Sequence, residues 1–341
     1  MPPLWFHHQA NFGHDIPGHP ERPERIRALE ARMDRDDWFG WERREAPVAT
    51  YEQLTAVHPE RHVDFIQSHC EAGGGAIDAD TVAVDGTWEL ITRAAGGAVA
   101  VVDALLSGEA PYAMSGMRPP GHHAEASQAM GFCFFNSVAV AARHATARHG
   151  LERVMIFDWD VHHGNGTNFI FHSDPGVLFC SIHQMPLYPG TGAASDIGTG
   201  AGENYTVNLP VPAGTGDPAY RSLAEHIACG LVRDYKPQLV LVSAGFDAHA
   251  ADPLASCQVT EAGFAGMTAS LRRACTAVGA PLGLVLEGGY SVEALAESVA
   301  AVAPVLSAEE EPPGEDVALH PLAEQAAGRL KRSWPSIAAA L

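Results

Sequence analysis

The 341-residue sequence lacks several features that would assign it to other protein classes. Its six cysteines are scattered without a C-x-x-C pair, and several lie in apolar runs, so we expect them to be buried and reduced. No stretch of 18 apolar residues occurs, so we expect no membrane span. The N-terminus has neither a basic segment nor a long apolar core, which argues against a signal peptide. A cytoplasmic globular protein is consistent with these absences.

Basic residues are also scarce. The chain has 21 Lys and Arg against 41 Asp and Glu, which gives a formal net charge of −20. Such an excess of negative charge argues against binding to a phosphate backbone, so we expect no nucleic acid partner. The same charge is compatible with cationic or polar ligands.

What the sequence does contain is a regular alternation of strand and helix patterns. This alternation predicts an α/β fold, a single domain with a mostly parallel central sheet flanked by helices. We expect a catalytic domain over 1–306, an acidic linker over 307–318 and a C-terminal helix over 319–341 that packs on the same domain. The predicted strands are 112–117, 154–157, 177–182, 239–243 and 282–286, and the predicted helices are 24–35, 59–69, 88–106, 136–149, 217–234, 260–278 and 291–305.

One predicted strand runs directly into a cluster of ionisable residues. Four apolar residues, 154–157, are followed by Asp158, Asp160 and His162. Side chains two positions apart on a strand share a side, so these three face the same way. Carboxylates and imidazole are zinc ligands, and three of them with one open position make a catalytic site. A salt-bridged strand end is the alternative, but three alternating ionisable groups favour a metal site.

Polar chemistry follows other predicted strands, and ligands of open α/β sheets collect at this edge. Asp247 ends a second apolar strand and is a candidate third metal ligand, although a turn or N-cap aspartate is the alternative. His122 and His123 are adjacent imidazoles after a Pro-Pro-Gly turn, and such a pair supplies a general base unless it is only structural. Asp158 and Asn165 are the groups available to orient them.

Three aromatic residues complete the candidate site. Tyr290 follows Glu-Gly-Gly, whose glycines permit a close backbone approach, and its phenol is suited to donate a hydrogen bond to a developing oxyanion. Phe132 and Tyr188 are candidates for the walls of a narrow channel, or equally for core positions.

Taken together, these segments resemble the arginase–deacetylase superfamily, and within it the zinc-dependent histone deacetylases, their bacterial relatives and the acetylpolyamine amidohydrolases. Asn165 and the Gly-Phe-Asp spelling are most similar to class II deacetylases. The resemblance covers about residues 14–300. Its motifs, in family order, are Arg118-Pro-Pro-Gly-His-His-Ala124, Gly131-Phe-Cys133, Asp158-x-Asp-x-His-His-Gly-Asn-Gly-Thr167, Ser181-x-His183, Pro189-Gly-Thr-Gly192, Ser243-Ala-Gly-Phe-Asp247 and Glu287-Gly-Gly-Tyr290.

The resemblance implies a role for each matching residue. One catalytic Zn²⁺ would be held by Asp160, His162 and Asp247. His123 would be the general base, and His122, oriented by Asp158, its electrostatic partner and a candidate acid for the leaving amine. Asn165 stands where many relatives have an aspartate, which leaves the basicity of His123 open. A structural K⁺ would be held by Asp158, Asp160, His162, Ser181 and Ile182, and a second by Phe171, Asp174, Val177 and Tyr205.

The resemblance also implies a substrate channel. Phe132 and Tyr188 match the aromatics that enclose the acyl-lysine methylenes, beside Gly131. Leu254 matches the gate position where polyamine-selective relatives place a glutamate, and an apolar gate would leave a cationic amine unpaired. The substrate-gripping aspartate of the rim falls at Asp80 rather than Asp78.

The expected function is removal of acetyl or related short acyl groups from acyl-lysine in proteins or peptides. A deacylase of acetylpolyamines or other small acylated amines is the alternative substrate class, and a catalytically weak acyl-lysine binding module is a third hypothesis. Dinuclear manganese chemistry of the arginase type is a more distant rival. The native metal and assembly into a homo-oligomer stay open.

Overall fold

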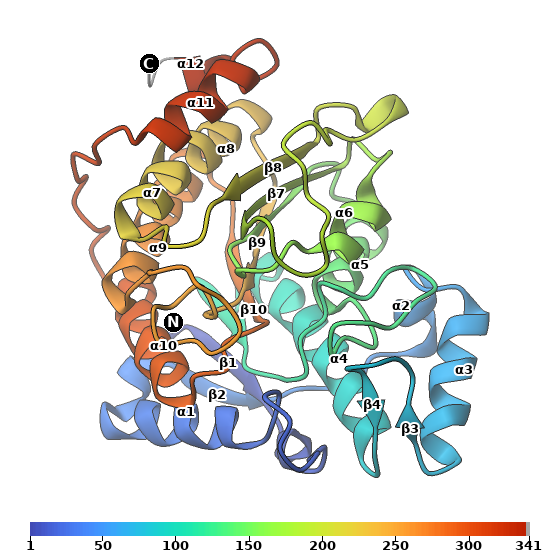
Figure 1. Cartoon of the computed structure of the whole chain (residues 1–341). Coiled ribbons are helices and arrows are strands. Elements are labelled where there is room, and N and C mark those ends of the chain that lie inside the picture. The colour runs from blue at the N-terminus through green and yellow to red at the C-terminus, as the bar shows by residue number, and fades with distance from the viewer. Residues whose placement is uncertain (339–341) are drawn as a thin grey trace.

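The protein is described here by a computed structural model that covers residues 1–338. Its centre is an eight-stranded sheet, ordered β2-β1-β5-β10-β9-β6-β7-β8, in which every neighbouring pair is parallel (Figure 1). A short antiparallel pair, β3 and β4, lies apart from it. The strands are β1 Leu4–His7, β2 Glu42–Glu45, β3 Gly75–Ala76, β4 Val82–Ala83, β5 Tyr112–Ser115, β6 Val154–Asp158, β7 Val177–Gln184, β8 Thr206–Val211, β9 Leu239–Ala244 and β10 Leu282–Leu286.

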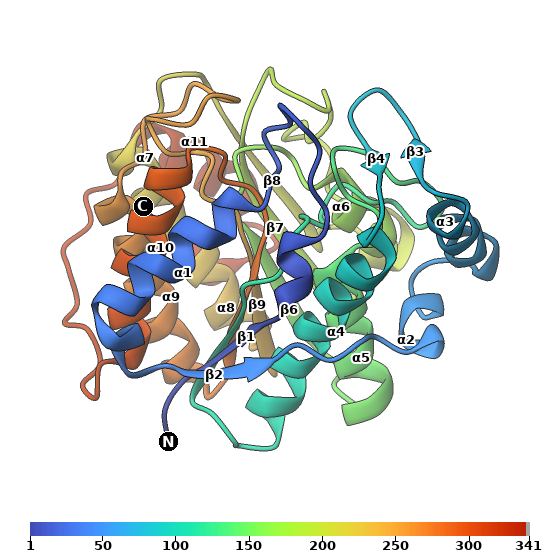
Figure 2. The ribbon, with the colours of Figure 1, turned by 90° about the horizontal axis from the view of Figure 1, so that it is seen from below.

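Helices cover both faces of the sheet. On one face lie α4 Thr87–Leu106, α5 Ser137–His149 and α6 Asn165–Phe171, with α2 Tyr51–Thr55 and α3 Glu60–Glu71 outside them (Figure 1). On the other lie α1 Glu24–Arg35, α7 Asp217–Ser222, the π-helix η4 Leu223–Ala228, α8 Cys229–Tyr235, α9 Glu261–Val278, α10 Val292–Ser307, α11 Pro321–Leu330 and α12 Pro335–Ala338. Short 3-10 turns are η1 Gln9–Phe12, η2 Asp37–Gly40 and η3 Gly200–Gly202. Figure 2 shows α1 lying along α10. The α/β fold predicted from the alternation of strands and helices is confirmed.

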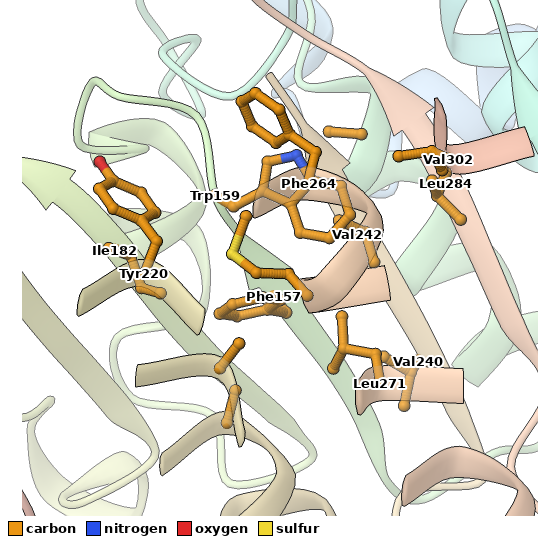
Figure 3. Packing of buried hydrophobic residues seen from close by; sticks show 14 of the residues in the cluster. Phe157, Trp159, Ile182, Tyr220, Val240, Val242, Phe264, Leu271, Leu284 and Val302 are labelled. Atoms are coloured by element: carbon orange, nitrogen blue, oxygen red, sulfur yellow. The ribbon is translucent and has the colours of Figure 1, made fainter. Parts of the chain in front are cut away.

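Two hydrophobic layers hold the helices to the sheet, and strand alternation divides residues between them. In β9, Val240 and Val242 face the larger cluster, and Leu239 and Leu241 face the smaller one. Figure 3 shows both valines in the larger cluster, with Val242 near Trp159 and Phe264 and Val240 beside Leu271. Because both faces of the central strands are buried, their sequences are continuous apolar runs, as expected for a parallel sheet.

Three strands of the main sheet were not predicted, and each has a physical reason to escape detection. β2 is Glu-Arg-Arg-Glu with all four residues exposed, which is a charged edge strand without an apolar pattern. β8 is the opposite edge and contains Pro210, a residue that edge strands tolerate. β1 has only four residues, too few to show a period.

The predicted helices agree with the structure to within about two residues at each end, with two exceptions. The predicted helix 217–234 is interrupted by the π-helical turn of η4. The single helix predicted over 319–341 is wrong for the described residues, which form α11 and α12 with a turn between them. Pro335 explains the break, because proline starts a helix well but cannot continue one.

The C-terminal helices pack on the body of the protein. Trp334 and Ile337 lie in the larger hydrophobic cluster with Ala323 and Ala327. Residues 308–320 contain neither helix nor strand. The division into a catalytic domain, linker and terminal helix stays a prediction, and residues 339–341 of that predicted helix lie outside the described part of the chain.

A close helix contact positions α4 against the sheet. A Cβ atom on Gly96 would lie 2.0 Å from the carbonyl oxygen of Pro47, and one on Gly97 would lie 2.7 Å from Ser115 Oγ. The two glycines therefore let α4 approach its neighbours. Within residues 1–338, no helix is both long enough and apolar enough to span a membrane.

Candidate active site

Four adjacent strands, β5, β10, β9 and β6, end at the same edge of the sheet and deliver the candidate catalytic residues. Asp158 is the last residue of β6 and pairs in register with Ser243 of β9 and Ser181 of β7. Asp247 lies shortly after β9 and Tyr290 shortly after β10. The order of the strands thus brings together residues that are far apart in the sequence.

Asp160, His162 and Asp247 form a buried group of possible metal ligands. One donor atom from each lies within 4.8 Å of the others. His162 Nδ1 is 3.1 Å from Asp160 Oδ1 and 3.1 Å from Asp247 Oδ2. Both aspartates are completely buried, and His162 is 8% exposed. The three ligands that the resemblance implied therefore converge, whereas Asp158, which the strand pattern grouped with Asp160 and His162, contacts His122 instead.

Backbone groups hold the two carboxylates in place. The N–H of Gly288 donates to Asp160 Oδ2 (2.9 Å), and the N–H of Val161 donates to Asp247 Oδ1 (2.8 Å). A Cβ atom on Gly288 would lie 2.1 Å from Asp247 Oδ2, so a glycine is required there. This is a physical reason for the Glu-Gly-Gly sequence that follows β10.

The electrostatics of the group suit a cation. Burial raises the pKa of Asp247 to about 7, and the nearby Asp160 carboxylate adds to the rise. Burial lowers the pKa of His162, but its hydrogen bonds with Asp160 and Asp247 outweigh this and raise it to about 10. A divalent cation would offset the repulsion between the carboxylates, and two carboxylates with one imidazole are ligands that zinc accepts. The residues present therefore fit a divalent metal.

The paired histidines have different partners. His122 Nδ1 is 3.0 Å from Asp158 Oδ2, and His123 Nδ1 is 2.8 Å from Asn165 Oδ1. Their ring centroids are 4.0 Å apart. The side-chain NH₂ of Asn165 donates to the carbonyl oxygen of His123 (3.3 Å) and to Glu125 Oε1 (3.0 Å). This network leaves the Asn165 oxygen as an acceptor, so His123 carries its proton on Nδ1 and keeps a lone pair on Nε2.

The two environments separate the pKa values of the pair. Burial lowers the pKa of His122, but Asp160 and Asp158 outweigh it and hold the pKa well above the usual value. Burial, His122 and His162 together hold the pKa of His123 well below its usual value. His123 is therefore neutral and able to accept a proton, whereas His122 favours the cation. Opposite shifts in two adjacent groups are typical of acid–base sites.

Three residues that support the site were not recognised from the sequence. Arg25 donates to the carbonyl oxygens of Gly289 (2.7 Å) and Glu287 (2.6 Å), and its guanidinium carbon is 4.9 Å from the centre of the Tyr290 ring. Asp252 Oδ2 accepts from the N–H of Tyr290 (2.6 Å), and its Oδ1 accepts from the N–H of Leu254 (3.0 Å).

Glu287 is the third of these residues. Its Oε2 accepts from the N–H groups of Gly121 (2.5 Å) and His122 (3.1 Å), and its Oε1 accepts from Ser243 Oγ (3.0 Å). Burial raises its pKa to about 7. Glu287 thereby fixes the turn that carries the paired histidines. The sequence offered only its position after a strand, which does not distinguish a buried support from a solvated carboxylate.

A cavity of about 230 Å³ reaches His162, one of the candidate metal ligands. The Phe132 and Tyr290 rings meet edge to face at 5.6 Å, and Tyr188 meets His123 at 5.1 Å. Both aromatic residues proposed as channel walls therefore belong to the cavity, not to the core. The lining consists of Asp80, His123, Gly131, Phe132, His162, Leu187, Tyr188, Leu254 and Tyr290.

This lining contains every residue suggested for substrate binding, together with Leu187, which was not suggested. Asp80 Oδ1 accepts from the N–H of Gly131 (3.2 Å), so the rim aspartate also supports the channel wall. Asp78 instead accepts from the N–H groups of Asp80 and Thr81 within its own turn. Of the two aspartates, Asp80 is thus the one at the cavity.

The residues suggested for potassium binding occupy two places. Asp158 and Ser181 are paired across β6 and β7, with Ile182 next in β7 and Asp160 and His162 beyond β6. The second set, Phe171, Asp174, Val177 and Tyr205, lies between α6 and the starts of β7 and β8. There the Asp174 carboxylate pairs with Arg143. Whether either place holds an ion stays a prediction.

Comparisons with known proteins agree with this arrangement. Residues 19–306 match the family model described as the histone deacetylase domain. The chain belongs to the histone deacetylase family. It is 42% identical over 295 residues to a probable deacetylase of Archaeoglobus fulgidus (84% of this chain, 81% of the relative), and 43% identical over 277 residues to the histone deacetylase-like amidohydrolase of Pseudomonas aeruginosa (80% and 73%). The crystal structure of the HDA15 HD domain superimposes with a TM-score of 0.92 at 34% identity, covering 99% of this chain and 97% of that domain.

These comparisons confirm the family and fold predicted from the motifs. They also confirm that this histone deacetylase family member is an enzyme of the deacetylase class. The geometry of the site is the basis for proposing the substrate, the metal and the role of each residue.

Proposed function

We propose that this enzyme removes acetyl or related short acyl groups from the ε-amine of acyl-lysine in proteins or peptides, with one zinc ion held by Asp160, His162 and Asp247. The observation that supports this best is the meeting of the three ligands, a neutral His123 and the Tyr290 phenol at the floor of one narrow cavity. Amide hydrolysis needs a base, a charge-stabilising donor and an activated water, and this floor offers a group for each.

When bound, zinc supplies a Lewis acid and lowers the pKa of a water ligand to roughly 7. His123 then accepts the proton of the attacking water at Nε2, because Nδ1 is engaged by Asn165. The Tyr290 hydroxyl donates to the developing oxyanion. His122, whose cationic form Asp158 and Asp160 favour, is the electrostatic partner. Its position behind His123 also makes it a candidate donor of the proton that the leaving amine takes.

The walls of the cavity favour an acyl-lysine side chain. Phe132 and Tyr188 present aromatic surfaces to the lysine methylenes, and Leu254 closes the gate with an apolar side chain. An internal secondary ammonium of an acetylpolyamine would meet Leu254 without a paired charge, which is costly. Asp80, which lines the same cavity, would accept a hydrogen bond from the backbone of a peptide substrate.

Further elements of the proposal are structural potassium at the two suggested places and a cytoplasmic location, which the six free thiols support. The alternative function, deacylation of acetylpolyamines or other small acylated amines, would use the same floor and differ at the rim. A binding module without catalysis is disfavoured, because binding alone requires neither the paired histidines nor Tyr290.

A parallel activity panel tests the proposal. The purified enzyme is assayed on an acetyl-lysine peptide, a trifluoroacetyl-lysine peptide and acetylated polyamines, each with and without a chelator. We expect the highest kcat/KM on the acyl-lysine peptides, loss of activity in chelator and its return with zinc. A large preference for acetylpolyamine would overturn the substrate assignment, and chelator-resistant turnover would overturn the metal assignment.

A further inference from the structure

A second group of metal-ligating side chains lies on the surface, where α4 packs on α5. Asp103 of α4 faces His144 and His149 of α5. His144 Nε2 is 2.8 Å and His149 Nε2 is 2.7 Å from the same oxygen, Asp103 Oδ1. The two imidazole rings meet edge to face, with centroids 5.4 Å apart. One donor atom from each residue lies within 4.8 Å of the others.

The side chains are held before any ion arrives. The His144 side chain is 10% exposed and that of His149 is 26% exposed, so packing limits their rotation. Both histidines belong to α5 and Asp103 belongs to α4, and these two helices are in extensive mutual contact. Binding therefore costs less conformational entropy than it would for ligands on a loop. Asp103 is about half exposed, which leaves a side open for an ion to enter and keep water ligands.

The donor set is selective for a class of ion. Imidazole nitrogen suits zinc, nickel and copper, and one carboxylate oxygen beside two imidazoles is an arrangement these metals accept. Calcium and magnesium prefer oxygen ligands alone, so they fit poorly. The net charge of −20 also raises the local concentration of cations around the protein.

We propose that Asp103, His144 and His149 form a second metal site, which binds Zn²⁺ or Ni²⁺ through one carboxylate oxygen and two Nε2 atoms, with water in the remaining positions. The ion joins α4 to α5 from outside. Asp103, His144 and His149 lie toward the C-terminal ends of α4 and α5, whereas the cavity residues Asp80 and Phe132 precede the N-terminal ends of these helices. The site therefore acts on stability rather than on catalysis, and it stands independently of the proposed deacylase function.

The chain offers a matched comparison. His172 Nε2 lies 2.7 Å from Asp196 Oδ1, which is the same imidazole–carboxylate contact at similar exposure but with one histidine. Two donors bind a metal much more weakly than three. A variant at His172 thus removes a surface histidine next to an aspartate without touching the proposed site.

Native mass spectrometry of the zinc-loaded enzyme, titrated with Ni²⁺, tests the site. We expect the wild-type protein to take up one further ion per chain and to gain thermal stability. His149→Gln and Asp103→Asn should each weaken this uptake at least about tenfold and abolish the gain. His172→Gln should retain both.

Two results would overturn the proposal. One is that neither the wild-type protein nor the His172→Gln control takes up a further ion during the Ni²⁺ titration. The other is uptake that His149→Gln and Asp103→Asn leave unchanged. Circular dichroism of each variant checks that it is folded. Because no activity is measured, the result can be interpreted even if the deacylase proposal fails.

Discussion

The floor and the rim of the cavity are built in different ways. At the floor, Asp160 and Asp247 are completely buried, and backbone N–H groups hold each carboxylate. At the rim, Tyr188 is 38% exposed, and aromatic contacts define its position. The floor has one geometry that a reaction requires, whereas the rim can change without disturbing it. We infer that the floor decides the chemistry and the rim decides the substrate.

The largest effect on activity is expected when one of the proposed metal ligands at the floor is removed. Asp247→Ala removes one of three metal donors and leaves the N–H of Val161 without its acceptor. We expect the metal content, measured by elemental analysis, to fall toward zero and activity to fall with it, by more than the roughly 100-fold that loss of an outer partner costs. Asp217→Asn, a change at a carboxylate away from the cavity, is the control. An unchanged zinc content would exclude Asp247 as a ligand.

The next effect is expected at the oxyanion donor. Tyr290→Phe keeps the ring beside Phe132 and Arg25 and removes only the hydroxyl. Loss of one such donor costs about 10²- to 10³-fold in kcat. Metal content and melting temperature should stay unchanged, which separates this variant from Asp247→Ala. Near-normal turnover on an acetyl-lysine peptide would remove Tyr290 from the mechanism.

Asp252 accepts hydrogen bonds from Tyr290 at the floor and from Leu254 at the rim, so its replacement should affect both regions of the cavity. Asp252→Asn puts an NH₂ group opposite one of the N–H donors of Tyr290 or Leu254. Hydrogen bonds to charged groups are worth about 1.5–3 kcal/mol, so we expect kcat/KM to fall at least about tenfold. Both kcat and the preference among acyl chains should change. A change in KM alone would limit Asp252 to the rim, and Asp217→Asn again controls for loss of a carboxylate that accepts from backbone.

A rim substitution should change selectivity and leave the chemistry intact. Leu254→Glu supplies the missing counter-charge for an internal ammonium of an acetylpolyamine. We expect the ratio of kcat/KM for acetylpolyamine over acetyl-lysine peptide to rise about 10- to 100-fold. Leu254→Gln, similar in size but uncharged, should leave the ratio nearly unchanged. If both variants behave alike, charge at the gate does not select the substrate.

The smallest effect is a pH dependence of stability that originates at His58, which is not part of the cavity lining. His58 Nδ1 lies 3.1 Å from the carbonyl oxygen of Ala126, and its Nε2 accepts from the N–H of Asn136 (3.0 Å), so the fold requires the neutral ring. Burial, with a smaller contribution from His62, lowers the pKa of His58 to about 3. The folded pKa is below the unfolded value, so the stability it contributes is present above about pH 6.5 and is lost as the pH falls.

This effect is measured as the slope of the free energy of unfolding against pH. The free energy of unfolding from urea titrations should fall between pH 6.5 and 5 less steeply in His58→Gln than in the wild-type protein, by up to about 1.4 kcal/mol per pH unit. His69→Gln, at a partly exposed histidine on α3, controls for loss of a histidine. Equal slopes in His58→Gln and the wild type would show that the ring does not resist protonation.

The fold could be predicted where burial leaves a pattern in the sequence. β6, β9 and β10 are apolar on both faces and stood out as strands, whereas the charged β2 carried no such signal although it belongs to the same sheet. The break before α12 depends on one proline in a segment whose apolar spacing otherwise suits a helix.

The site could be predicted where chemistry-bearing residues follow strands at close spacing, as in Asp160 and His162. Supporting residues could not, because their partners are remote. Arg25 bonds the backbone of Gly289, 264 positions away, and Asp252 reaches Tyr290 across 38. The local sequence around an arginine in a charged helix, or around an aspartate before a proline, does not predict such a contact.

The most direct test of the central claim is to locate the metal. Crystals of the protein loaded with one equivalent of zinc would be measured above and below the zinc absorption edge. We expect a single strong anomalous peak within about 2.0–2.2 Å of donor atoms from Asp160, His162 and Asp247, beneath the Tyr290 hydroxyl. A peak at Asp103, His144 and His149 instead, with none at the cavity floor, would contradict the account.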